Sequence, residues 1–190
     1  KEELLERWEE KAKSLDVLRG ADVTGIARRD GKLEVKTAAG ESLFAKRVIV
    51  AIGRLGNPRE LGVPGEDLTC VYSALLNPGK YGDRDLVVVG GGNSAVEAAL
   101  ALAPANRVML VHRSDGFHRV SRANRTQLEA AERDGRLRLS LGSRVRQFRP
   151  DAAIVSTPGG ELEVPLDAGF VLIGADPPTS FLKRQGVTFE

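Results

Sequence analysis

The chain contains few sulfur-containing and aromatic residues. One cysteine, one methionine, one tryptophan and two tyrosines occur in 190 residues, and aromatic residues make up 5% of the total. A single cysteine excludes a disulfide within the chain and is typical of a reducing compartment, so we expect a cytoplasmic protein. The low aromatic content argues against the stacking platforms that bind single-stranded nucleic acid.

Long apolar runs and metal-binding motifs are also missing. No apolar run approaches the length of a membrane span, and the start Lys1-Glu2-Glu3 is not a signal peptide, so we expect no membrane partner. His112 and His118 are six residues apart in an expected loop, which is poor spacing for a metal pair. No zinc motif or nucleophile elbow occurs, and we predict neither a metal site nor a catalytic side chain.

Lysine is absent between Lys80 and Lys183, whereas residues 107–149 hold eleven arginines and four acidic residues. A basic surface of this kind is compatible with nucleic-acid binding. Beside the glycine-rich motif described next, attraction of a polyanionic cofactor or an acidic electron-carrier protein is the simpler interpretation. We therefore expect no nucleic-acid partner.

The segment 86–100, LVVVGGGNSAVEAAL, contains a short apolar run, three glycines and the start of a helix rich in small residues. Its glycines and an alanine have the G-x-G-x-x-A spacing of dinucleotide-binding turns, which leave the N–H groups of a helix N-terminus facing phosphates. The alternative is a tight turn that binds nothing. A second apolar strand over 106–111 completes the unit and favours binding. The predicted cofactor-binding residues here are Gly90, Gly91, Gly92, Asn93, Ser94 and Ala95.

The residues after the second strand indicate which nucleotide is bound. An NAD site usually has an acidic residue there, but this chain has His112-Arg113-Ser114 and no carboxylate before Asp115. A guanidinium pairs with a 2′-phosphate through charge-assisted hydrogen bonds, which a carboxylate would repel. We therefore favour NADP(H) over NAD(H) and add these three residues to the site. The alternative is that Arg113 is a solvated surface arginine.

These motifs resemble those of the flavin-dependent pyridine nucleotide oxidoreductases of the thioredoxin reductase type, over nearly the whole chain. The family loop reads close to "HRR" followed three residues later by Arg. His112 and Arg113 match this loop, whereas Ser114 replaces the second arginine and His118 takes the last arginine position. The resemblance therefore adds the adjacent Arg119 to the predicted site, with Arg122 as the alternative.

Two further segments carry the resemblance. Residues 48–53 look like the segment where the family's chain leaves its flavin domain, and 170–174 look like the returning strand, which adds Ile173 and Gly174 to the site. The family's flavin-binding glycine motif and its C-terminal G-D motif are not found. The implied domains are 1–60, the latter part of a first FAD-domain segment with a linker; 61–174, the NAD(P)H-binding domain; and 175–190, the start of the returning FAD-domain segment.

Thioredoxin reductases carry a redox C-x-x-C just before this domain's glycine turn, where this chain has Ser73 and Leu76. A shifted remnant at Cys70 stays open as an alternative. The better match is to relatives without the motif, the ferredoxin–NADP reductase-like and bacillithiol-disulfide-reductase-like flavoproteins.

The resemblance implies an NADP(H)-binding domain that positions nicotinamide for hydride transfer to FAD. FAD is expected only in the full-length protein, and the fragment itself is expected to be inactive. The expected partners are the missing FAD domain of the same chain and an unknown electron acceptor, and a homodimer is left open. The alternative is a non-catalytic dinucleotide-sensing module.

The predicted fold class is α/β: a Rossmann-like three-layer nucleotide-binding domain with a parallel sheet and a small β-meander, plus flanking pieces of a flavin domain. Periodicity predicts an amphipathic helix over 2–14 and a run over 48–52 that is buried. Predicted helices of the nucleotide domain cover 93–103 and 122–134. Predicted strands cover 22–28, 32–37, 42–50, 86–89, 106–111, 137–141, 144–148, 152–156, 161–165 and 169–173.

Overall fold

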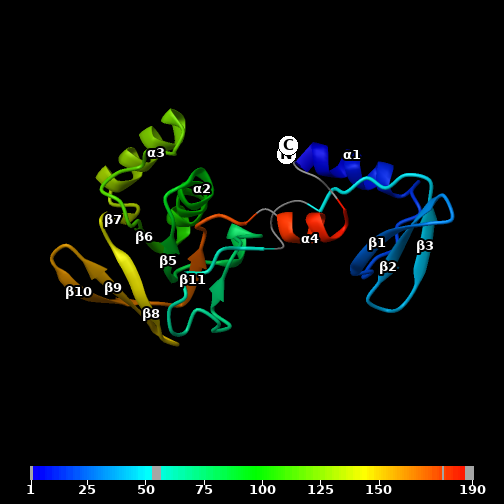
Figure 1. Cartoon of the computed structure of the whole chain (residues 1–190). Coiled ribbons are helices and arrows are strands. Elements are labelled where there is room, and N and C mark those ends of the chain that lie inside the picture. The colour runs from blue at the N-terminus through cyan, green and yellow to red at the C-terminus, as the bar shows by residue number, and fades with distance from the viewer. Residues whose placement is uncertain (1, 53–56, 177, 187–190) are drawn as a thin grey trace. The chain divides into compact units, whose positions relative to one another are not determined.

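The computed structural model describes residues 2–52, 57–176 and 178–186, and the chain divides into two compact units (Figure 1). One unit contains residues up to 52 together with those from 179 onward. The other unit contains the residues between them. Each unit is described by itself below.

The first unit contains an antiparallel sheet with strand order β1-β2-β3 and two helices. The turn between β1 and β2 has positive φ at both Asp30 (48°) and Gly31 (76°), which is the backbone conformation that an Asp-Gly hairpin favours. Strand β2 also pairs antiparallel with β3 across a turn in which Gly40 has a φ of 85°, so both predicted hairpins of this meander are confirmed. The elements are α1 (Glu2–Ala12), β1 (Val23–Arg29), β2 (Lys32–Thr37), β3 (Ser42–Ala45) and α4 (Thr179–Arg184).

The prediction that 42–50 is one strand ending in a buried run was wrong. Strand β3 ends at Ala45, and residues 46–52 form no strand. Ile49 is 91% exposed, and Val50 and Ile52 are also exposed. An apolar run becomes a buried strand only where neighbouring strands and a covering layer exist. Among the described residues β3 pairs with β2 alone, and nothing pairs with the run that follows.

The second unit has the predicted β-α-β-α-β arrangement at its centre. Five parallel strands lie in the order β4-β11-β5-β6-β7, and a separate antiparallel sheet has the order β10-β9-β8. The main sheet contains β4 (Val71–Tyr72), β5 (Asp85–Val89), β6 (Arg107–Val111), β7 (Arg138–Ser140) and β11 (Ala168–Val171). The other elements are α2 (Asn93–Leu102), α3 (Arg122–Arg133), β8 (Arg144–Phe148), β9 (Ala152–Thr157), β10 (Gly160–Pro165) and the short 3₁₀ turns Pro78–Lys80 and Ala103–Ala105.

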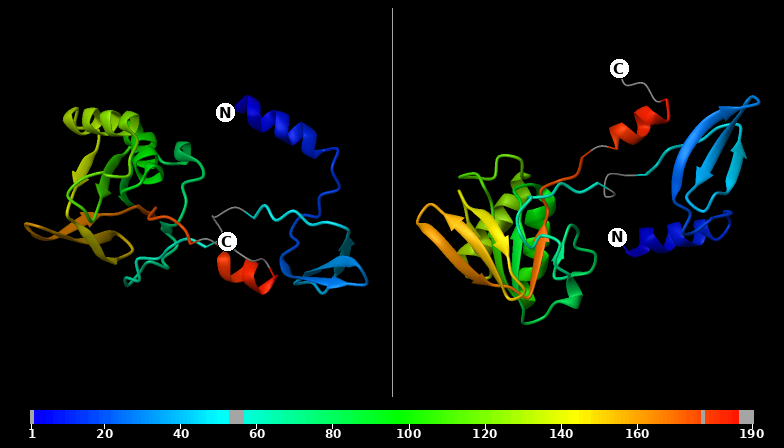
Figure 2. Two further views of the ribbon diagram at one scale, coloured as in Figure 1. Left: turned by 45° about the horizontal axis from the view of Figure 1, so that its top comes forward. Right: turned by 60° about the horizontal axis from the view of Figure 1, so that its bottom comes forward.

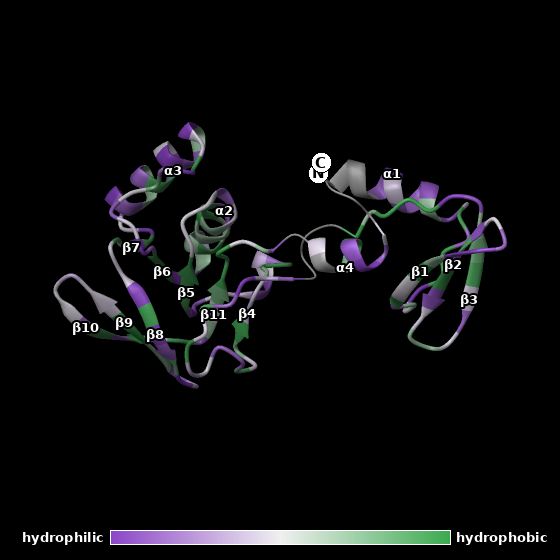
Figure 3. Ribbon diagram, viewed as in Figure 1, coloured by the Kyte–Doolittle hydropathy of each residue, from purple (hydrophilic) through white to green (hydrophobic). Residues whose placement is uncertain are grey.

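Side-chain alternation along the central strands produces three layers (Figure 2). In β5, Leu86 and Val88 pack toward the helices, in the same cluster as Val96 and Leu128. Val87 and Val89 pack on the opposite face, in a cluster with residues of β8 and β9. A strand buried on both faces reads as a continuous apolar run, which is why the central strands are green in Figure 3. The predicted fold class is confirmed.

The helix ends follow local sequence rules. Helix α2 ends at Leu102, just before Pro104. The Ser121 hydroxyl accepts a hydrogen bond from the Asn124 N–H (3.2 Å) and caps α3, and Gly135 follows the helix with a φ of 69°. Both helices begin at the predicted residue and end one residue earlier than predicted.

Two segments at the limits of the second unit run antiparallel to each other. The Arg59 N–H donates to the Gly174 carbonyl (3.0 Å), and the Asp176 N–H donates to the Asn57 carbonyl (2.9 Å). The Arg59 guanidinium also pairs with the Asp176 carboxylate at 2.6 Å. These contacts fix residues 57–59 beside the carboxyl end of β11. The domain limits at 60 and 174 stay a prediction.

Candidate functional site

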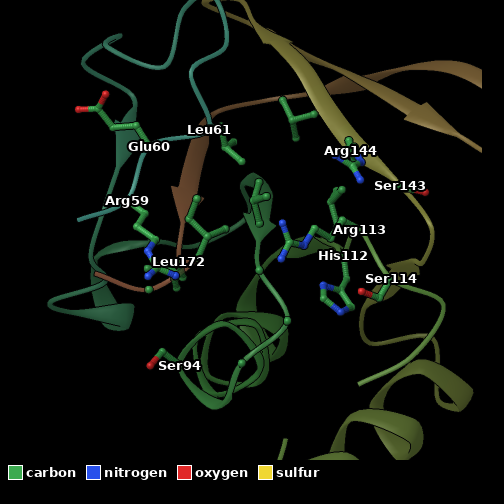
Figure 4. A pocket seen from close by; sticks show the side chains of 18 of the residues that line it. Arg59, Glu60, Leu61, Ser94, His112, Arg113, Ser114, Ser143, Arg144 and Leu172 are labelled. Atoms are coloured by element: carbon green, nitrogen blue, oxygen red, sulfur yellow. The ribbon is translucent and has the colours of Figure 1, made fainter. Parts of the chain in front are cut away.

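A pocket of about 1160 Å³ lies at the carboxyl ends of β5, β6 and β11 (Figure 4). Strand order reverses between β5 and β11, and such a switch point is where open α/β sheets bind ligands. Most of the predicted cofactor-binding residues line this pocket, and Asn93 and Ala95 are the two that do not. The lining residues among them are Gly90, Gly91, Gly92, Ser94, His112, Arg113, Ser114, Arg119, Ile173 and Gly174.

Gly90 is required by the packing of the protein itself. Its φ is 152°, and a Cβ added there would collide with the Leu172 carbonyl oxygen and lie 2.7 Å from the Ala95 Cβ. Ala95 is fully buried against the turn. These two residues therefore let β11, the turn and α2 approach one another closely, as expected for the first glycine and the small residue of such a motif.

Gly92 is different, because the described protein atoms do not require it. It is the N-cap of α2 with an ordinary backbone conformation (φ −104°, ψ 176°), and a Cβ added there meets no atom within 4 Å. The missing side chain instead leaves the first turn of α2 open toward the pocket that Gly92 lines. The unpaired N–H groups of a helix N-terminus and its positive dipole end favour an anion.

His112 packs as a support for the turn. Its ring stacks on Phe117, with centroids 5.1 Å apart, and a Cβ on Gly91 would run into the imidazole. Burial lowers the pKa of His112 below its ordinary value, against the effect of a hydrogen bond with the Gly116 backbone, and the charge of Arg113 lowers it further. The imidazole is therefore neutral near pH 7 and adds no positive charge to the pocket.

The Asn93 side chain joins the starts of two helices. Its Oδ1 accepts hydrogen bonds from the Ser121 N–H (2.9 Å) and from Asn124 Nδ2 (3.1 Å). The same Asn124 amide donates to Glu97 Oε1 at 3.0 Å. Asn93 and Glu97 thus hold the start of α3 beside α2, and the network fixes the end of the loop that begins at His112.

Four arginines line the pocket without a carboxylate partner. Among the described residues, no carboxylate pairs with the guanidinium groups of Arg113, Arg119, Arg144 or Arg146. Arg122, the alternative predicted for phosphate binding, does not line the pocket. Arg144 and Arg146 were missed from the sequence. The sequence shows an arginine-rich region, but only the fold of β8 shows that Arg144 and Arg146 face the pocket.

The positions expected for a redox dithiol hold no sulfur. Leu76 is 90% exposed, and Ser73 lies on the surface nearby. Cys70 is partly buried against the apolar cluster that β5 shares with β8 and β9, and its carbonyl accepts a hydrogen bond from the Gly169 N–H (2.8 Å). Cys70 therefore has a packing environment, and it is the only thiol in the 190 residues.

The described residues also bear on metals and membranes. Over residues 2–52, 57–176 and 178–186, no group of three or more His, Cys, Asp or Glu side chains is placed to hold a metal ion. In the same ranges, no helix combines the length and the apolar character needed to cross a membrane.

Comparison with known proteins agrees with the predicted resemblance. The chain is 33% identical to ferredoxin–NADP reductase from Ignicoccus hospitalis, over 97% of this chain and 62% of that protein. It is 31% identical to thioredoxin reductase from Mycolicibacterium smegmatis, over 96% and 60%. The solved bacillithiol disulfide reductase from Bacillus cereus superposes with a TM-score of 0.84 at 29% identity, covering 98% of this chain and 60% of that one.

The chain thus spans about three fifths of the length of these relatives. The family model described as pyridine nucleotide-disulphide oxidoreductase matches residues 3–190. The resemblance inferred from the glycine turn and the His112-Arg113 loop is confirmed, and the chain belongs to the pyridine nucleotide-disulphide oxidoreductase family.

Proposed function

We propose that residues 57–176 bind NADP(H) and position its nicotinamide for hydride transfer to an FAD held by another part of the full-length protein. The observation that carries this proposal is Gly92. It leaves the start of α2 open toward the pocket although no protein atom fills the space where a side chain would lie. Because Gly92 also lines the pocket at the start of a helix, its open space suits a ligand that approaches the backbone there.

The pocket residues fit the two charged parts of this cofactor. The N–H groups at the start of α2, beside Gly91 and Gly92, suit the pyrophosphate. Arg113 and Arg119, which have no carboxylate partner among the described residues, suit a 2′-phosphate. Ile173 and Gly174 line the pocket from the end of β11.

When bound, NADPH supplies a hydride, and the protein supplies orientation and electrostatics. No side chain of the pocket is assigned a role as a general acid or base. We propose that Gly90–Gly92 and the loop from His112 hold the nucleotide. The segments 57–59 and 174–176 connect this nucleotide-binding part to the rest of the chain. The isolated 190 residues should then bind NADP(H) without FAD, so the purified chain should lack flavin absorbance.

For the electron acceptor we propose only a class. Because the chain has one cysteine, a redox C-x-x-C cannot lie within it. This favours a reductase of the ferredoxin–NADP reductase or bacillithiol disulfide reductase type over a thioredoxin reductase with a redox dithiol. We expect the acceptor site to include parts of the protein beyond these residues. Full-length protein assayed with NADPH and each acceptor class separates these types.

Gly92→Val tests the nucleotide site. We expect the wild-type chain to bind NADPH and the variant to bind both NADPH and NADH at least about tenfold more weakly, because the new side chain occupies the space over the start of α2. Gly82→Val is the matched control, since a Cβ at Gly82 also meets no atom within 4 Å but this residue lies outside the pocket.

Isothermal titration calorimetry measures the affinities, and thermal unfolding checks that all three proteins are folded. A wild-type chain that binds neither nucleotide at millimolar concentration would contradict the proposal. So would a folded Gly92→Val variant with unchanged affinity.

A further inference from the structure

Arg144 enters the pocket from a backbone segment that is hydrogen bonded to both neighbours of Arg113. The Ser143 N–H donates to the His112 carbonyl, and the Gly142 N–H donates to the Ser114 carbonyl, each at 2.9 Å. Figure 4 shows Arg113 and Arg144 coming to the same pocket, one after the end of β6 and the other at the start of β8. The spacing of the two arginines is therefore set by main-chain contacts.

The turn that precedes Arg144 is held by internal hydrogen bonds. Ser143 is only 1% exposed, and its hydroxyl donates to the Leu141 carbonyl (2.8 Å) while it accepts from the Ser140 hydroxyl (2.9 Å). Gly142 supplies the positive φ of 59° that the turn needs. The buried Ser143 hydroxyl and its hydrogen bonds give the backbone before Arg144 a fixed position, unlike that of an arginine on a loose surface loop.

A β-bulge sets which side chains of β8 face outward. Val145 is opposite Val155 on β9 and Gln147 is opposite Ile154, so Arg146 has no opposing residue. The extra residue lets both Val145 and Phe148 enter the core. Bulges of this kind re-aim side chains beside functional sites. Arg144 precedes the bulge, and simple alternation with the buried Val145 places it on the exposed side, at the pocket.

The charge of Arg144 is not compensated within the described protein. No carboxylate pairs with Arg144 or with Arg113, whereas the nearby Arg149 pairs with Glu163 at 3.0 Å. Two guanidinium groups held in one pocket repel each other, and an anion between them would relieve the repulsion and gain charge-assisted hydrogen bonds. The pocket therefore presents two unpaired cationic side chains that an anion on the β8 side can engage.

We propose that Arg144 and Arg113 bind the same phosphate group, so that the 2′-phosphate of NADP(H) is held between β8 and the end of β6. This inference rests on the proposed function and adds a specificity-determining residue to it. It assigns a role to β8, which the glycine motif and the His112-Arg113 loop do not involve.

Arg144→Ala in the 190-residue chain tests the inference by calorimetric titration with NADPH and NADH. We expect NADPH affinity to fall at least about tenfold while NADH affinity changes less than about twofold, because NADH has no 2′-phosphate. Arg144→Lys should give an intermediate loss, since an ammonium keeps the charge but not the planar fork. Arg133→Ala, which removes a charge from the end of α3 outside the pocket, is the matched control and should change neither affinity.

The outcomes separate this inference from the proposed function. If the wild type prefers NADPH and Arg144→Ala keeps that preference, or if both affinities fall equally, Arg144 does not hold the 2′-phosphate and only this inference fails. If the wild type binds neither nucleotide, the proposed function fails. Titration with adenosine 2′,5′-bisphosphate and with AMP repeats the comparison without nicotinamide and should give the same selective loss for Arg144→Ala.

Discussion

The arginines at the two ends of strand β6 differ in whether a carboxylate pairs with them. Strand β6 begins with Arg107, and Arg113 follows its other end. At the amino end, Arg107 pairs with Asp83 and Asp85, and Arg84 pairs with Asp167 at 3.1 Å. At the carboxyl end, Arg113 has no carboxylate partner among the described residues.

The arginines beside the starts of β5 and β6 have carboxylate partners within the protein. Hydrogen bonds that Arg107 donates to the Asp85 and Asp83 carboxylates raise the pKa of Arg107 above its ordinary value. The hydrogen bond from the Asp85 N–H lowers the pKa of the Asp167 carboxyl, and the hydrogen bond and charge of Arg84 lower it further. These exposed pairs link the starts of β5 and β6 to the segment before β11. The residue type is thus the same at both ends, and the presence or absence of a partner distinguishes a structural arginine from one available to a ligand.

Gly90→Ala should have the largest effect on stability and sharpens the comparison through a glycine at each end. The new Cβ would meet the Leu172 carbonyl and the Ala95 methyl at an unfavourable φ, so we expect a loss of about 3 kcal/mol in the free energy of unfolding. Gly82→Ala, beside Asp83 at the amino end, has open space and should change stability by less than about 0.5 kcal/mol. Urea unfolding of both variants measures the difference. Equal stabilities would contradict the close packing described for the carboxyl end.

The lowered pKa of His112 predicts a smaller, pH-dependent effect at the carboxyl end. Because burial lowers the pKa of folded His112, the unfolded chain takes up a proton first as pH falls below about 6.5, and the free energy of unfolding decreases. We expect His112→Gln to weaken this decrease between pH 7.5 and 5.5, and His118→Gln, which changes an exposed side chain, to preserve it. Thermal unfolding midpoints across this range provide the test. An identical pH dependence in His112→Gln and the wild type would show that His112 titrates normally.

Sequence patterns predicted best those parts of the molecule whose structure is determined locally. The buried strand and glycine turn over 86–95 carry their own signal, since alternating core contacts require a continuous apolar run and the turn requires glycine. Ser121 and Gly135 likewise mark the ends of α3 by local capping. The order of elements from β5 to β11 follows from these signals.

The remaining features depend on contacts between distant segments. Strand β4 has two residues and owes its place to β11, so it has no periodicity to recognise. The run 48–52 has the composition of a buried strand but lacks a partner in the described residues. Arg144 faces the pocket because it alternates with the buried Val145 in β8 and because the Ser143 N–H donates to the His112 carbonyl. Neither contact is visible in the spacing of arginines.

The most direct test of the account is a calorimetric comparison of Arg113→Ala with Arg107→Ala, titrated with NADPH and with NADH. A guanidinium–phosphate pair is worth roughly 1.5–3 kcal/mol, so Arg113→Ala should weaken NADPH binding about tenfold to a hundredfold and leave NADH binding nearly unchanged. Arg107→Ala should lower the unfolding temperature by a few degrees at most and leave both affinities unchanged. Equal losses of NADPH and NADH in Arg113→Ala, or a loss of NADPH preference in Arg107→Ala, would contradict the assignment of the unpaired arginines to the 2′-phosphate.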